Sequence, residues 1–71
     1  MKLVTIRNNE IDEVINQYKT RDNIANTMLG VATRLQKMIE CDFYCKWGEN
    51  WVVVYNSDNQ VIITVDVEEL S

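Results

Sequence analysis

The sequence predicts an α+β fold with the element order β-α-α-β-β-β. Between residues 10 and 39, apolar residues recur at the three- and four-residue spacing of helices, and from Phe43 onward they alternate as in strands. A short β-branched run, Leu3–Ile6, precedes the helical region. We expect a three-stranded antiparallel meander, with Leu3–Ile6 added as an edge strand and the helices packed on one face.

The first predicted helix follows a turn at residues 7–9. The 0, 3, 4, 7 spacing of one helical face is met by Ile11, Val14, Ile15 and Tyr18. Asn9 is a suitable cap for this helix. The helix dipole favours anions in the first turn, which would hold Glu10, Asp12 and Glu13. We therefore interpret the acidic cluster as helix-start chemistry in preference to a catalytic carboxylate pair.

A second, longer helix is predicted after the capping candidates in residues 20–23. Its apolar residues recur at intervals of four and three at Ile24, Met28, Val31, Leu35 and Met38, and Ile39 follows directly. The pattern stops near Cys41 and Asp42, which gives a helix of about four to five turns. We expect its apolar face to pack on the sheet, with the methionines as gap-filling core residues.

The meander is predicted from three strands, Phe43–Trp47, Trp51–Tyr55 and Val61–Val67. They are separated by turns at residues 48–50 and 56–59, both rich in turn formers. In the first turn, Gly48 or Asn50 is expected to adopt positive φ. A three-residue first loop places Trp47 opposite Trp51, and a five-residue second loop places Tyr55 near Val61.

This register predicts which residues share each face of the sheet. The core face would be Phe43, Cys45, Trp47, Trp51, Val53, Tyr55, Val61, Ile63, Val65 and Val67, because no polar residue interrupts it. The outer face would be Tyr44, Lys46, Val52, Val54, Ile62, Thr64 and Asp66. An apolar centre with a charged rim is typical of an interaction surface. The alternative is a solvated face whose branched residues serve only strand propensity.

Length and composition limit the class of protein. The chain has 71 residues, a net charge of -4, no proline and 46% hydrophobic residues, which indicates a single small globular domain over residues 1–71. A surplus of acids argues against direct binding of nucleic acid. The N-terminal residues do not resemble a secretory signal, and no apolar run approaches the ~20 residues of a membrane helix. We expect a cytosolic protein that does not enter membranes.

The residue types needed for common catalytic and metal sites are scarce. The sequence has no histidine, so the usual general base near neutral pH and the Ser-His and Cys-His pairs are missing. Cys41 and Cys45 could form half of a zinc site, but no further Cys or His is present to complete it. We interpret Cys45 as a small buried hydrophobe. The sequence therefore predicts no catalytic activity, no cofactor and no metal.

Charge is distributed unevenly along the chain. Residues 1–39 hold six bases and four acids, whereas residues 40–71 hold one base and seven acids. Among these acids, Glu68 and Glu69 are predicted to face a partner. The excess can serve solubility and protect strand ends, or it can steer the protein toward a basic partner surface.

One segment resembles a known family. The string from Phe43 to Trp51 is similar to the dynein light chains, which have an aromatic residue, Cys, Gly and an aromatic residue at this spacing. The preceding helix opens with Asp22, Ile24 and Ala25, as it does in that family, so the resemblance covers residues 22–51. The family's glycine after the second aromatic is replaced by Val52, and the chain is about one strand short. The resemblance implies only a compact helix-on-sheet module that dimerises through its sheet.

These observations lead to two hypotheses about function. The first is a non-enzymatic acidic protein-interaction module that forms a homodimer through the outer sheet face, because small cores gain stability from association. The second is a monomeric acidic inhibitor, of the kind encoded by phages and mobile elements. It would block a basic site on a host protein, including a site that normally binds nucleic acid.

Overall fold

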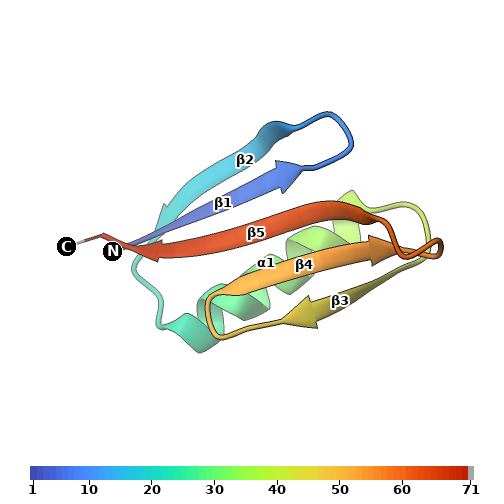
Figure 1. The fold of residues 1–71 in the computed structure, drawn as a ribbon. Coiled ribbons are helices and arrows are strands. Elements are labelled where there is room, and N and C mark those ends of the chain that lie inside the picture. Colours follow the sequence, from blue (N-terminus) through green and yellow to red (C-terminus); the bar gives the residue numbers. More distant parts are fainter. Residues whose placement is uncertain (71) are drawn as a thin grey trace.

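The computed structural model describes residues 1–70, in which five strands and one helix form two layers (Figure 1). The elements are β1 (Lys2–Asn8), β2 (Glu13–Thr20), α1 (Ile24–Met38), β3 (Phe43–Trp47), β4 (Trp51–Asn56) and β5 (Val61–Glu69). The strands make one antiparallel sheet in the order β2-β1-β5-β4-β3. The order is thus β-β-α-β-β-β, and the predicted fold with two helices is wrong.

The core lies between the helix and one face of the sheet. Helix α1 crosses this face beside β4 and β5 (Figure 1), and from it Val31 and Leu35 are buried. The sheet contributes Val4, Ile6, Val52, Val54, Ile62, Ile63, Val65 and Val67. Burial of a branched aliphatic side chain is worth about 1.5–3 kcal/mol, so this cluster is the main source of stability.

The segment predicted as the first helix is strand β2. Its sequence, EVINQYKT, contains Val, Ile, Tyr and Thr, which fit a pleated strand better than a helix. Antiparallel pairing of β2 with β1 places Tyr18 beside Val4. Ile11, Val14 and Ile15 are exposed, so the residues at helical spacing do not form a buried face. The N-terminal strand also lies inside the sheet, between β2 and β5, and not at its edge.

A turn at residues 9–12 replaces the predicted helix start. The side-chain oxygen of Asn8 accepts a hydrogen bond from the backbone N–H of Glu10 (2.9 Å), an arrangement that favours a turn over a helix. Asp12 has a φ of 53°, a left-handed conformation that Asp tolerates better than most residues. Its carboxylate accepts a hydrogen bond from Arg7 (3.2 Å). The acidic cluster therefore belongs to a β-hairpin and not to a first helical turn.

The second predicted helix is confirmed as α1. Asn23 is its N-cap, and its side-chain oxygen accepts a hydrogen bond from the backbone N–H of Asn26 (2.8 Å). The buried residues of α1 recur with the expected spacing at Thr27, Val31 and Leu35. The guanidinium of Arg34 lies 3.9 Å from the ring centroid of Tyr18, which connects the helix to β2 by a cation–π contact.

The three predicted meander strands are confirmed, but their register differs by one residue. Trp47 pairs with Val52 and Cys45 pairs with Val54, because the backbone N–H of Gly48 donates to the carbonyl of Trp51 (2.9 Å). The β3–β4 loop therefore has two residues and not three. A one-residue shift exchanges the two faces of a strand. Val52 and Val54 accordingly face the helix, whereas Trp51, Val53 and Tyr55 face away from it.

A β-bulge corrects the face assignment of one further residue. Val54 pairs with Ile63 and Tyr55 pairs with Val61, so Ile62 is the extra residue on β5. Ile62 and Ile63 are each only 5% exposed, although they are adjacent in the strand. The prediction that Ile62 lies on the outer face is therefore wrong, while the predicted proximity of Tyr55 and Val61 is confirmed.

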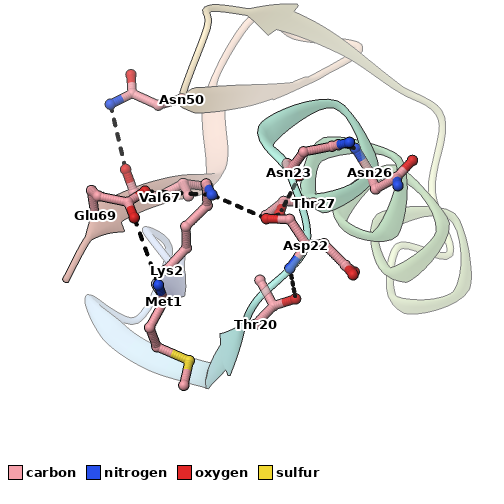
Figure 2. A network of polar contacts seen from close by, with 10 residues as sticks. All are labelled: Met1, Lys2, Thr20, Asp22, Asn23, Asn26, Thr27, Asn50, Val67 and Glu69. Carbon is pink, nitrogen blue, oxygen red and sulfur yellow. Dashed lines mark hydrogen bonds and ion pairs between the residues drawn. The ribbon is translucent and has the colours of Figure 1, made fainter. Parts of the chain in front are cut away.

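Polar contacts join the beginning of the helix to the first residue of β1 and the last residue of β5 (Figure 2). The Lys2 ammonium donates to the carbonyl of Asp22 (3.0 Å) and lies 3.4 Å from the Glu69 carboxylate. The hydroxyl of Thr27, the one buried polar residue described, donates to the carbonyl of Asn23 (2.9 Å). These contacts fix the start of α1 over the sheet.

The burial of Val54 predicts opposite outcomes for substitutions at neighbouring positions. Val54→Lys would place an ammonium without a partner in the core and should abolish the folded state, and Val54→Ala should cost about 1.5–3 kcal/mol. Val53→Lys should change the free energy of unfolding by less than about 1 kcal/mol, because that side chain can reach water. Circular dichroism and urea titration measure both effects. Retention of the fold in Val54→Lys would contradict the register.

Candidate functional site

The helix leaves one face of the sheet uncovered, and we call this the outer face. Cross-strand partners share a face of the sheet. The residues of the outer face are therefore identified by following the strand pairing from Trp51 and Val53 to the neighbouring strands. They are Leu3, Thr5 and Arg7 on β1, Val14, Gln17 and Lys19 on β2, Tyr44 and Lys46 on β3, Trp51, Val53 and Tyr55 on β4, and Val61, Thr64, Asp66 and Glu68 on β5. This face is the candidate functional site.

An aromatic and aliphatic group covers the β3–β4 half of the outer face. The rings of Tyr44 and Tyr55 stack with centroids 5.0 Å apart and an angle of 11° between their planes. The Lys46 ammonium lies 5.2 Å from the centroid of Tyr55. Val53 follows Tyr55 on the same face, and Trp51 follows Val53. We call Tyr44, Trp51, Val53 and Tyr55 the aromatic patch.

The position of Trp51 depends on the glycine opposite it. A Cβ atom at position 48 would clash with the indole ring of Trp51, so the ring lies directly over the Gly48 backbone. Gly48 does not adopt positive φ, and neither does Asn50. The glycine is thus required for this close approach and not for its conformational freedom. Trp51 remains 40% exposed and Tyr44 43% exposed, which leaves large rings available at the surface.

Charged residues of both signs surround the aromatic patch. Asp66 and Glu68 lie on the central strand β5, where Asp66 pairs with Trp51. Arg7 and Lys19 lie on the far side of β5, on β1 and β2, and Lys46 lies on β3. The outer face therefore has an acidic line between two basic flanks, and it lacks the continuous basic stripe that binds a phosphate backbone.

The structure divides the predicted interaction residues into two groups. Tyr44, Lys46, Thr64 and Asp66 lie on the outer face, and their role in binding stays a prediction. Val52, Val54 and Ile62, predicted as the apolar centre of that face, are core residues with 0%, 0% and 5% exposure. Prediction from the sequence missed the residues that replace them, Trp51, Val53 and Tyr55. The sequence contains one signal for these three residues. An aromatic ring often covers a glycine on the neighbouring strand, so Gly48 and Trp51 indicate a cross-strand pair and a loop of two residues.

The two acids predicted to face a partner lie on opposite sides of β5. Glu68 is exposed on the outer face, where it pairs with Leu3. Glu69 contacts the terminal amino group of Met1 (3.6 Å) and the ammonium of Lys2 (3.4 Å). Glu69 is therefore engaged within the chain, although it is 65% exposed, and exposed ion pairs of this kind contribute little to stability.

The cysteines lie on different surfaces. Cys41 is exposed after the helix, whereas Cys45 packs against the core, and both are free thiols. Burial raises the pKa of the Cys45 thiol, which makes it a poorer nucleophile at neutral pH. Within residues 1–70, no group of three or more Cys, Asp or Glu side chains is arranged to hold a metal ion.

Comparisons with known proteins do not assign the chain to a family. No family model, curated protein or solved structure matches it, and the resemblance of residues 22–51 to the dynein light chains carries no further argument. In the part of the chain that the structure describes, no helix is both long and apolar enough to cross a membrane.

The contact between Gly48 and Trp51 generates a prediction for the outer face. Gly48→Ala should displace the indole ring into water, since a Cβ atom cannot fit beneath it. In a Trp47→Phe background, where Trp51 is the sole tryptophan, the emission should shift to longer wavelength and acrylamide quenching should increase. Val61→Ala, an exposed position on another strand, is the control. Unchanged fluorescence in the Gly48→Ala variant would contradict the described ring position.

Proposed function

We propose that the chain is a non-enzymatic protein-interaction module that binds a second copy of itself through the outer face. The observation that carries this proposal is the aromatic patch on an uncovered sheet face. Tyr and Trp are enriched in the buried centres of protein interfaces, where they bury a large area at low entropic cost. A solvated sheet face would be expected to carry polar residues at these positions.

The arrangement of charge favours a second copy as the partner. In a two-fold dimer the same surface meets itself, so the surface must be self-complementary. The outer face satisfies this condition, because acids on β5 lie between bases on β1, β2 and β3. Two such sheets would stack about 10 Å apart, with the aromatic patches at the centre and the helices outside.

Association would also offset the small size of the core. A chain of about 70 residues buries only about 60% of the surface that its unfolded form exposes. Many domains of this size gain stability from disulfides, metals or oligomerisation, and here both cysteines are free. Free thiols are also the state that the cytosol maintains, so we propose a cytosolic location.

The proposal predicts that Trp51 is required for self-association. Trp51→Glu places an unpaired carboxylate at the centre of the interface and should raise the dimer dissociation constant at least ~10-fold, which corresponds to ~1.4 kcal/mol. The matched control is Leu29→Glu, which removes an apolar residue that is 66% exposed on the helix and adds the same charge. Sedimentation velocity over a range of protein concentrations measures both variants.

Two outcomes would contradict the proposed dimer. A wild-type chain that stays monomeric at high micromolar concentration would remove the basis for it. Equal weakening by Trp51→Glu and Leu29→Glu would show that association depends on net charge or on another surface. Circular dichroism of each variant establishes that the fold is intact, because neither side chain belongs to the buried core.

The second candidate is an acidic inhibitor that occupies a basic site on another protein. Its support comes from the fold, since strand pairing gathers six of the eleven acids at one end of the sheet. These acids are Glu10, Asp12, Glu13, Glu40, Asp42 and Asp58, and they are distinct from the predicted pair Glu68 and Glu69. A protein with this charge distribution would be steered toward a basic partner at low salt.

A further inference from the structure

The end of the sheet that gathers these six acids is defined by strand direction, and we call it the acidic end. Strands β1 and β4 end there, at Asn8 and Asn56, and β2, β3 and β5 begin there. Figure 1 shows that helix α1 also ends on this side, next to the chain that leads into β3. Segments far apart in the sequence thus place acidic residues at the same end of the sheet.

Little positive charge offsets these carboxylates. Among the described residues, the bases at the acidic end are Arg7, which is paired with Asp12, and Lys37 in the last turn of the helix. The C-terminal carbonyls of α1 add the negative end of the helix dipole. The opposite end of the sheet is nearly balanced, with Asp22, Glu49, Glu68 and Glu69 accompanied by Lys2, Lys19, Arg21 and the terminal amino group. The chain is therefore strongly polarised from end to end.

An apolar hollow opens at the acidic end, between the β1–β2 hairpin and the end of the helix. Because α1 stops at Met38, it does not cover the first part of β2. The hollow has a volume of about 320 Å³ and is open to solvent, and we call it the hairpin groove. Its apolar lining includes Ile15, Met38, Ile62 and Ile63, and Glu10 and Glu40, which also line it, are here called its acidic rim. Ile15 is 40% exposed there, so an aliphatic side chain stands uncovered beside two acids.

We propose that the hairpin groove binds a cationic segment of a partner protein, with one or two apolar side chains inserted and Lys or Arg residues beside them. Apolar side chains would cover Ile15 and Met38, which supplies affinity through burial. Cationic neighbours would meet Glu10 and Glu40, which supplies steering and orientation. Anionic membranes and nucleic acids carry the same sign of charge as the rim, so they are disfavoured as occupants.

This inference deepens the second candidate function, because it names the surface and the chemistry of the basic partner. It does not depend on self-association, since the hairpin groove and the aromatic patch lie on different elements. The groove is formed by the β1–β2 hairpin, the end of α1 and the start of β5, whereas the aromatic patch is formed by β3 and β4.

A peptide provides the probe. Fluorescein-labelled Gly-Lys-Lys-Leu-Phe-Lys-Arg-Gly carries an apolar pair between cations, and fluorescence anisotropy measures its binding. The double variant Glu10→Gln/Glu40→Gln should weaken binding at least ~10-fold, or ~1.4 kcal/mol. The control is Glu49→Gln/Glu68→Gln, which changes the net charge equally at the opposite end and should weaken binding less than about 2-fold. Ile15→Ser, an exposed position, should weaken binding without loss of the fold.

The results separate the groove from general charge attraction and from the dimer. Equal weakening of binding by the two double variants would overturn the proposal that the hairpin groove binds the peptide. Equal binding of a peptide with Ser in place of Leu and Phe would overturn it as well. Absence of binding to the wild-type chain at submillimolar concentration would also overturn it. Trp51→Glu should leave peptide binding unchanged, and loss of binding in that variant would move the contact to the outer face.

Discussion

One helix can cover only one face of a five-stranded sheet, and the rest of the structure depends on which face that is. The covered face is determined by the alternation of side chains in β4, where Val52 and Val54 are fully buried and Val53 is not. These valines meet Val31 and Leu35 of the helix in one cluster. A shift of one residue in β4 would expose this cluster and bury Trp51 and Tyr55 in its place.

The same constraint creates both candidate binding surfaces. The uncovered face has to carry Trp51, Val53 and Tyr55, because they alternate with the buried valines. The helix is also too short to cover the first residues of β2, which leaves Ile15 exposed beside Met38. A small helical layer thus accounts for an aromatic patch on one side of the sheet and for an acidic, apolar groove at its end.

Helix α1 and strands β3 to β5 could be predicted from the sequence, because their apolar spacing extends over several periods and their boundaries carry caps and turn formers. Strand β2 could not, since Ile11, Val14, Ile15 and Tyr18 fit a helical face. Its pairing with β1 decides the outcome, and pairing is a tertiary effect. Ile11, Val14 and Ile15 are exposed, so of the four residues at helical spacing Tyr18 alone packs against the core.

Four residues predicted for the outer face, Tyr44, Lys46, Thr64 and Asp66, lie on it, whereas Val52, Val54 and Ile62 are buried in the core. The error arose from the length assigned to the β3–β4 loop. A loop of three residues turns one face of β4 toward the core, and a loop of two residues turns the other face toward it. Gly48 distinguishes the two loop lengths, because it lies beneath the ring of Trp51 and therefore pairs with that residue. The bulge at Ile62 had no signal in the sequence, since a run of valine and isoleucine fits either register.

Nuclear Overhauser contacts between methyl groups test directly which side chains of β4 face the helix. Because Val52 and Val54 face the helix, we expect contacts from both to Val31 and Leu35, and none from Val53 to these helix methyls. The measurement distinguishes the faces without any substitution, and it does not depend on the oligomeric state. Contacts from Val53 to Val31 and Leu35, with none from Val54, would show that the opposite face of β4 packs against the helix.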